Sequence, residues 1–129
     1  MLKKNKGNFM RLSDFGDGTK QFILALSSLL INKNKVMYLD EIDNGIHHSK
    51  LDELWEVILK TSKKLNVQVF ATTHSKECIE SYARVAKKLE DEEVTLIRLA
   101  KLKNGEINAG VFDYGVLESA ISQEHEVRG

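Results

Sequence analysis

The chain has 129 residues, which is the size of one compact domain. Hydrophobic residues make up 42% of the sequence and charged residues 29%, a balance that argues against both a disordered chain and a membrane protein. The 19 lysines and arginines are balanced by 19 acids, so the chain as a whole has no electrostatic reason to bind nucleic acid or an anionic membrane.

The first predicted elements are a short extended run at residues 8–12 and a glycine-containing loop at residues 13–18. From Thr19 onward, apolar residues recur at helical spacing. This periodicity predicts a helix from about Asp17 to Ile31. The carboxylate of Asp17 suits the positive end of the helix dipole.

Two short apolar runs, residues 35–40 and 67–72, are typical of strands buried on both faces of a parallel sheet. A predicted helix at residues 50–65 lies between them. Ser49 is its expected N-cap, and Asp52 follows three residues later in a pattern close to a capping box. A strand, a helix and a second strand in this order predict a parallel connection.

The rest of the chain begins with a third predicted helix, at residues 76–89. Strand-like runs at residues 94–102 and 106–112 flank an Asn-Gly pair, which is the strongest short signal for a hairpin. A final helix is predicted from residue 114 to about residue 122. The fold class is therefore α/β, with mainly parallel strands flanked by helices, then a β-hairpin and a C-terminal helix.

Polar residues of catalytic type follow both parallel strands. Asp40 and Glu41 end the first strand, and His74 follows the second. Ligands of open α/β sheets bind beyond the carboxyl ends of the strands, so these side chains are expected to converge there. An aspartate at this place can orient Mg²⁺ through water, a glutamate can polarise an attacking water, and a histidine can hydrogen-bond a phosphate oxygen.

Four segments of the chain occur in the order expected of one family. Together they resemble the C-terminal half of an ABC/SMC-like P-loop ATPase, in the AAA-family or OLD-like branch. They are similar, in turn, to the signature loop, the Walker B strand with its catalytic glutamate, the D-loop and the switch-histidine segment. The four segments are residues 13–19, 36–41, 43–47 and 69–75.

The resemblance implies an ATPase with ATP as substrate and Mg²⁺ as cofactor. Asp40 would hold Mg²⁺ through water, Glu41 would be the general base, and His74 would contact the γ-phosphate. The expected fold is a partial P-loop NTPase lobe of the ABC type.

The resemblance also implies a contact between protomers. Ser13, Gly16 and Gly18 of the glycine loop would reach ATP bound by a second protomer, although the loop departs from the common Leu-Ser-Gly-Gly-Gln signature. Backbone N–H groups and a helix N-terminus both favour phosphate. Asp43, in the segment similar to the D-loop, is also assigned to the nucleotide site.

The sequence has no Gly-x-x-x-x-Gly-Lys-Ser/Thr motif, the P-loop that wraps nucleotide phosphates. In the family that segment lies upstream, so residues 13–129 are interpreted as the C-terminal lobe and residues 1–12 as an N-terminal extension. We expect weak or no ATP binding by the chain alone. The expected partner is the N-terminal ATPase half or a full-length homologue, in a homodimer or a hetero-oligomer, with nucleic acid contacted only through a partner.

Two other functions compete with this interpretation. The first is a non-catalytic interaction or dimerisation module derived from such an ATPase. The second, more remote, is a metal-dependent nuclease that uses the same acids and His74. The acids lack the Asp-x-Asp spacing of such enzymes, and no basic surface is evident in the sequence.

The remaining chemistry-bearing residues favour structural roles. His47 and His48 could bind a metal with Asp43, but a solvated loop is the favoured interpretation. Cys78 is the single cysteine and has no evident base beside it, so inert packing is expected. With no internal disulfide, no apolar signal-peptide core and no membrane-length apolar stretch, a cytoplasmic location without a membrane partner is predicted.

Overall fold

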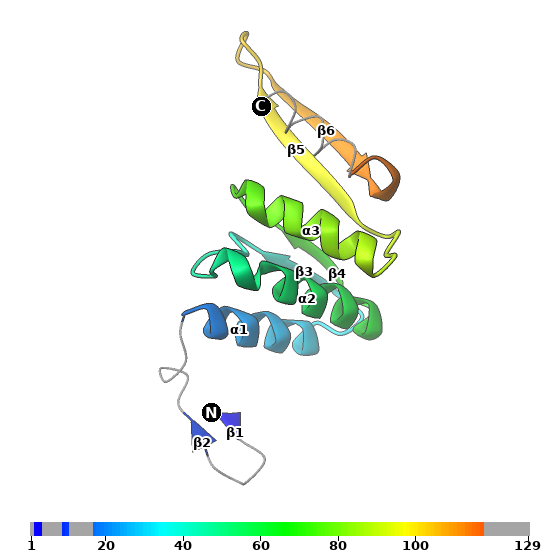
Figure 1. The fold of residues 1–129 in the computed structure, drawn as a ribbon. Coiled ribbons are helices and arrows are strands. Elements are labelled where there is room, and N and C mark those ends of the chain that lie inside the picture. Colours follow the sequence, from blue (N-terminus) through cyan, green and yellow to red (C-terminus); the bar gives the residue numbers. More distant parts are fainter. Residues whose placement is uncertain (1, 4–8, 11–16, 118–129) are drawn as a thin grey trace.

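The structure, a computed structural model, describes residues 2–3, 9–10 and 17–117. Figure 1 shows helices stacked beside a short parallel sheet, with a long hairpin at the far side of the stack. The elements are β1 (Leu2–Lys3), β2 (Phe9–Met10), α1 (Asp17–Ile31), β3 (Val36–Leu39), the 3-10 turn η2 (His48–Lys50), α2 (Leu51–Leu65), β4 (Gln68–Ala71), α3 (Lys76–Lys88), β5 (Thr95–Lys101) and β6 (Ile107–Asp113).

The strands β3 and β4 pair in parallel, with Val36 opposite Gln68 and Leu39 opposite Ala71. The helix α2 makes the connection between them, as a parallel pair requires. The α/β class and the parallel strands predicted from the sequence are confirmed.

The two faces of this sheet differ in burial. Met37, on the side of the helices, is 4% exposed, whereas the neighbouring Tyr38 is 77% exposed. Successive side chains of a strand point to opposite faces, so the helices cover one face and leave the other open. The ring of Tyr38 stacks on that of Phe70 on the open face, with 5.3 Å between the ring centroids.

The core lies between the three helices and the covered face of the sheet. Its main cluster consists of Ala25, Ile42, Leu51, Leu54, Trp55, Ile58, Cys78 and Val85. The indole Nε1 of Trp55 donates a hydrogen bond of 3.0 Å to the carbonyl oxygen of Cys78, which joins α2 to α3 inside this core. None of the helices in the described part of the chain has the length and hydropathy that a bilayer crossing needs.

The predicted N-cap of the second helix is wrong. Ser49 lies inside the turn η2, and the side chain of His47 accepts the Ser49 N–H at 3.2 Å. Helix α2 begins at Leu51 after Lys50, which makes no capping hydrogen bond through its side chain. Asp52 was expected in a capping box. Its carboxylate instead accepts hydrogen bonds from Ser81 and Arg84 of α3, and these bonds join α2 to α3.

The hairpin predicted around the Asn-Gly pair is confirmed. Strands β5 and β6 pair antiparallel, with Ile97 opposite Val111. Gly105 has a φ of 88°, a left-handed conformation that glycine adopts without steric cost. The final helix begins as predicted at residues 114–117, where Leu117 is buried against α3, and its remainder lies outside the described residues.

The predicted N-terminal extended run corresponds in part to β2, which pairs antiparallel with β1. Helix α1 begins at Asp17, as predicted. Residues 11–16, which include most of the predicted glycine loop, lie outside the described residues.

Candidate functional site

A single hydroxyl joins the ends of the two parallel strands. Thr72, directly after β4, donates a hydrogen bond from Oγ1 to Oδ1 of Asp40, directly after β3. The same Oγ1 accepts the backbone N–H of Glu41 at 2.9 Å. The carbonyl oxygen of Thr72 accepts the N–H of Ile42 at 3.0 Å. One threonine therefore fixes both acids that were predicted to carry chemistry.

The backbone of Glu41 is in the left-handed region, with a φ of 47°. This conformation costs a residue with a β-carbon about 1–2 kcal/mol, and such residues gather at functional sites. The hydrogen bond from Glu41 to Thr72 holds the turn in place. Both acids are exposed, so a ligand above the sheet can reach their carboxylates.

A second threonine orients the next acid. Thr73 Oγ1 donates to Oδ1 of Asp43 at 2.6 Å and accepts the N–H of Ser75 at 3.0 Å. Ser75 is the N-cap of α3, where its hydroxyl accepts the N–H of Cys78 at 3.1 Å. Asp43 is thus tied to the rigid start of a helix.

The structure brings the predicted Asp40, Glu41 and Asp43 to the segment that follows β4. His74 belongs to that segment, between Thr73 and the N-cap of α3, and it is exposed. Polar side chains from two strands therefore share one edge of the sheet, as ligand sites of α/β folds require.

Of the three residues predicted to contact ATP across a protomer boundary, the structure describes only one. Gly18 lies in the first turn of α1, and Ser13 and Gly16 lie outside the described residues. The contact across a protomer boundary is therefore a prediction that the described geometry does not test.

Thr72 and Thr73 are not among the site residues predicted from the sequence. The available signal was a pair of hydroxyl side chains immediately before His74, at the end of a strand that runs beside Asp40. A hydroxyl both donates and accepts, so it can connect a carboxylate to a backbone N–H. Short polar residues beside a predicted acid are therefore candidates for positioning it.

The residues near Asp40 fit a magnesium ion held mostly by water and phosphate. Among the described residues, no group of three or more His, Cys, Asp or Glu is arranged to enclose a metal. Mg²⁺ keeps several waters and takes one or two protein carboxylates beside substrate phosphates. Asp40 offers one exposed carboxylate, with Oδ1 already oriented by Thr72, which suits that mode.

Two further side chains have structural roles. His47 uses Nδ1 to bond Ser49 Oγ at 2.8 Å and to accept the Ser49 N–H, so its ring caps the turn η2. Cys78 is fully buried, and burial raises the pKa of its thiol to about 11. The thiol is therefore protonated at neutral pH and is a poor nucleophile, as the sequence predicted.

Comparisons with known proteins show the family and the fold of the chain. The fold is shared with an SMC ATPase chain, from a study of ATP-driven dimerization and DNA-stimulated activation of SMC ATPases, at a TM-score of 0.61 and 17% identity. The alignment covers 95% of this chain and 67% of that one. Together with the family and the relatives that follow, this likeness shows a P-loop ATPase-like chain.

A family model matches residues 1–80, and the chain belongs to that family, described as "AAA domain, putative AbiEii toxin, Type IV TA system". An ATP/GTP phosphatase of Helicobacter pylori is 38% identical over 79 residues, which are 59% of this chain and 21% of that protein. An uncharacterized protein of Methanocaldococcus jannaschii is 34% identical over 73 residues, 57% of this chain and 64% of that protein. The chain thus spans about a fifth of the first relative and under two thirds of the second.

Proposed function

We propose that this chain supplies the hydrolytic half of a composite Mg·ATP site. The observation that carries the proposal is the pair Asp40 and Glu41, bridged by the hydroxyl of Thr72 at the shared end of β3 and β4. Both carboxylates are exposed, while the Thr72 hydroxyl fixes Oδ1 of Asp40 and the backbone N–H of Glu41. This arrangement presents two acids in a fixed position to water and to a metal ion.

Each residue takes one role in this proposal. Asp40 orients the waters of Mg²⁺, which when bound would neutralise charge on the phosphates. Glu41 accepts a proton from the attacking water. His74 hydrogen-bonds the terminal phosphate and distinguishes the nucleotide before and after hydrolysis.

The proposal requires a second polypeptide segment. The 129 residues carry no P-loop, and phosphoryl transfer needs a phosphate cradle with its lysine. That segment comes from an N-terminal ATPase half or a full-length homologue. Ser13, Gly16, Gly18 and Asp43 are proposed to complete the site between the two.

The first experiment measures ATP turnover when the chain is combined with the P-loop-bearing half of a relative. Glu41→Gln is expected to slow turnover by about 10²-fold or more. ATP affinity is expected to stay within a factor of about two, because the side chain keeps its size and Thr72 still holds its backbone N–H.

Glu92→Gln is the matched control, because Glu92 is also an exposed glutamate but lies in the turn before β5. Its turnover is expected to equal that of the wild type. Near-normal turnover in Glu41→Gln would remove Glu41 from the role of general base. A calorimetric titration of Mg·ATP into the isolated chain is expected to show no saturable heat, since the cradle is missing.

A second function, a non-catalytic interaction module, is favoured by one specific observation. The open face of the β3–β4 sheet exposes Val36 at 44%, Tyr38 at 77% and Phe70 at 44%. Exposed apolar patches of this kind mark interaction surfaces. Binding of a partner ATPase that is unaffected by Glu41→Gln, without turnover in any combination, would establish this alternative.

A further inference from the structure

His74 lies in a small turn that the hydroxyl of its neighbour closes. Thr73 Oγ1 accepts the N–H of Ser75 at 3.0 Å, so His74 is the middle residue of a three-residue turn. Threonine hydroxyls close such turns by bonding the backbone two residues further on. The position of the His74 backbone therefore depends on where the Thr73 hydroxyl lies.

The same hydroxyl has a second partner, in the segment that follows β3. It donates to Oδ1 of Asp43 at 2.6 Å, across 30 positions of the chain. A hydroxyl has one proton, so this bond sets the direction of the Thr73 O–H and of the lone pairs that remain. One of those lone pairs accepts the Ser75 N–H. The bond to Asp43 and the turn around His74 are therefore not independent.

Asp43 lies in a turn that its own backbone holds together. Its carbonyl oxygen accepts the N–H of Ile46 at 3.0 Å. The N–H of Asn44 bonds the carbonyl oxygen of Glu41 at 2.9 Å. Ile42, between the two acids, is 2% exposed and packs in the main core. Glu41 and Asp43 therefore belong to one short segment with a fixed shape.

The turn around His74 is fixed on its other side by α3. Ser75 is the N-cap of this helix, and its hydroxyl accepts the N–H of Cys78 at 3.1 Å. The carbonyl oxygen of Cys78 accepts the indole N–H of Trp55 in the core at 3.0 Å. The Thr73 hydroxyl therefore lies between two anchored segments, the turn at Asp43 and the start of α3.

We propose that Thr73 is a positioning residue, whose hydroxyl couples the geometry of His74 to that of Asp43. A phosphate held by His74 displaces the three-residue turn, and the shared hydroxyl passes the displacement to Asp43 and its segment. Thr73 acts through these two residues and not on the nucleotide. The coupling itself is a property of the free chain, while its use in turnover rests on the proposed function.

The first test measures the coupling in the isolated chain without nucleotide, by amide hydrogen exchange followed residue by residue with NMR. Asp43→Ala removes the acceptor of the Thr73 proton and leaves residues 73–75 unchanged. We expect the Ser75 amide to exchange at least about 3-fold faster, because the hydroxyl is then free to turn away from it. The amide of Ile58 in the core should not change, which shows that the fold is kept.

Asn44→Ala is the matched control, because Asn44 lies beside Asp43 in the same turn and is exposed. It should leave exchange at Ser75 unchanged. Unchanged exchange at Ser75 in Asp43→Ala would overturn the inference. Equal acceleration in the two variants would overturn it as well, because a general loosening of the turn would then explain the result.

The second test measures turnover in the reconstituted site. Thr73→Val should lower kcat by about 10-fold and leave KM within a factor of about two, and Thr73→Ser should recover most of the loss. The double variant with Asp43→Ala should be no slower than the slower single variant, since both changes break the same bond. Thr61→Val, at a half-buried threonine of α2, is the control and should turn over at the wild-type rate.

Three results would decide between the proposals. Slow turnover in Glu41→Gln with normal turnover in Thr73→Val would keep the catalytic proposal and overturn the coupling. Losses that multiply in the double variant would also overturn the coupling, because the two residues would then act separately. No turnover in any combination, with faster Ser75 exchange in Asp43→Ala, would contradict the proposed function and support the coupling.

Discussion

At the scale of single residues, Thr72 decides how the candidate site is held. Its hydroxyl is both the donor to Asp40 and the acceptor for the Glu41 N–H. No other side chain in the described residues makes hydrogen bonds to both. In the proposed function Thr72 is a positioning residue, because it would act on the reaction through the two acids.

Replacing Thr72 by valine keeps the shape of the side chain and removes both hydrogen bonds. We expect turnover in the reconstituted site to fall by about 10-fold or more, because Glu41 loses the bond that holds its left-handed backbone. ATP affinity should change less than turnover. Steady-state kinetics would measure the split between kcat and KM.

The conservative variant Thr72→Ser is the control, because serine keeps the hydroxyl. It should restore at least half of the lost rate. If Ser and Val variants are equally slow, the methyl group of Thr72 matters more than its hydroxyl and the positioning role is wrong.

His74→Ala tests the proposed phosphate contact. Turnover should fall more than ATP affinity, because the contact strengthens as charge develops on the terminal phosphate. The exposed His48, in the turn before α2, supplies the matched control His48→Ala, which should leave the rate unchanged. An unchanged turnover rate in His74→Ala would show that His74 does not contact the terminal phosphate.

The candidate acids could be predicted from the sequence, but the residues that position them could not. Asp40, Glu41 and His74 follow apolar runs, and this pattern can be recognised in the sequence without knowledge of the fold. The hydrogen bonds of Thr72 and Thr73 depend on which strands lie side by side, which is a property of pairing. The left-handed backbone of Glu41 has no local sequence signal either, since glutamate does not favour it.

At the scale of elements, α2 and α3 are joined by a charged contact as well as by the core. Arg84 donates to Asp52 at 3.0 Å through Nε and at 2.6 Å through Nη2. The buried Ser81 donates to the same carboxylate at 2.5 Å. The hydrogen bond from Arg84, with help from Ser81, lowers the pKa of Asp52 below its ordinary 3.8.

This contact makes stability depend on pH in acid. The native pKa of Asp52 is depressed, so its contribution is fully present above about pH 3.8 and is lost as the pH falls through the native value. Asp52→Asn should lower the free energy of unfolding by roughly 0.5–1 kcal/mol at pH 6, since both partners are half exposed. Urea unfolding from about pH 6 to about pH 2 should show this difference shrink.

Glu92→Gln is the control, because Glu92 is exposed and is not part of the contact between α2 and α3. Its free energy of unfolding should equal that of the wild type at every pH. A constant difference between wild type and Asp52→Asn across the whole range would mean that the ionisation of Asp52 is not what joins the helices.

Most element boundaries could be predicted because helical and strand periods are local. Helix α1 has its predicted bounds, and α2 and β4 begin within one residue of theirs. The N-cap at Ser49 failed because a 3-10 turn capped by His47 precedes the helix.

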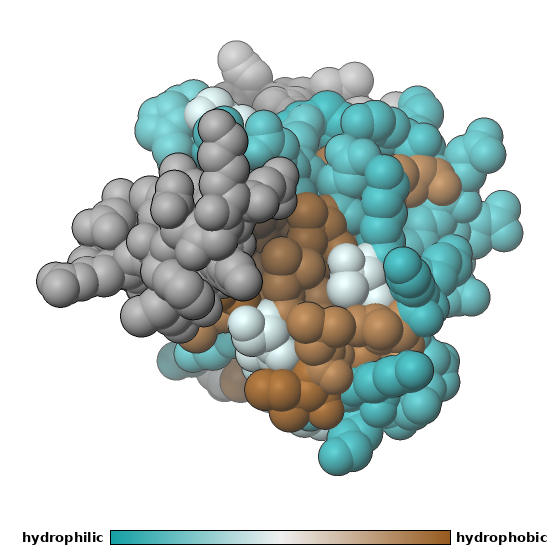
Figure 2. Space-filling model, turned by 90° about the horizontal axis from the view of Figure 1, so that it is seen from below, coloured by the Kyte–Doolittle hydropathy of each residue, from teal (hydrophilic) through white to brown (hydrophobic). Residues whose placement is uncertain are grey.

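At the scale of the whole molecule, apolar surface is exposed on more than one side. Figure 2 shows apolar side chains gathered on the face seen from the side of α1. Leu24, Leu30 and Ile31 of that helix are 58%, 65% and 75% exposed. Tyr38 and Phe70 add a second apolar surface on the open face of the sheet.

These surfaces predict self-association of the isolated chain. In sedimentation velocity the wild type should sediment faster as its concentration rises. Tyr38→Ser should reduce that dependence, because Tyr38 is the most exposed large side chain of the sheet. Ile107→Ser, a similarly exposed position on β6 at 73%, is the control and should change it less.

A sharp monomer of the wild type at every concentration would contradict this prediction. It would also mean that the open face of the sheet stays exposed to solvent without causing association.

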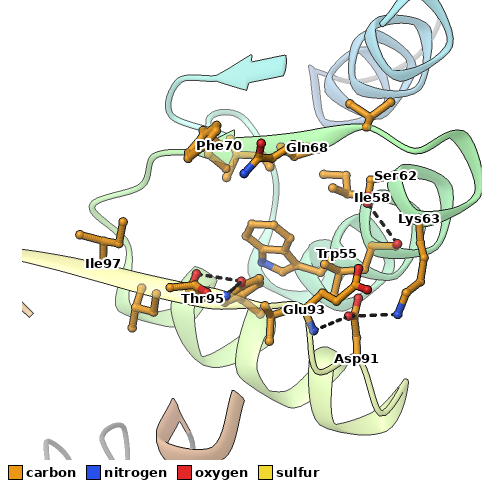
Figure 3. Close-up of a pocket in the computed structure, with 18 of the residues that line it drawn as sticks. Trp55, Ile58, Ser62, Lys63, Gln68, Phe70, Asp91, Glu93, Thr95 and Ile97 are labelled. Carbon is orange, nitrogen blue, oxygen red and sulfur yellow. Dashed lines mark hydrogen bonds and ion pairs between the residues drawn. The ribbon is translucent and has the colours of Figure 1, made fainter. Parts of the chain in front are cut away.

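The placement of Trp55 has an optical consequence. It is the single tryptophan of the chain, and its ring lines the cavity between β4 and β5 (Figure 3), with 4.8 Å between its centroid and that of the Tyr82 ring. When the protein is excited at a wavelength that tyrosine does not absorb, its emission therefore originates from this cavity alone. Mixing experiments on the millisecond scale can then follow, from the native fluorescence, any change in the surroundings of this cavity.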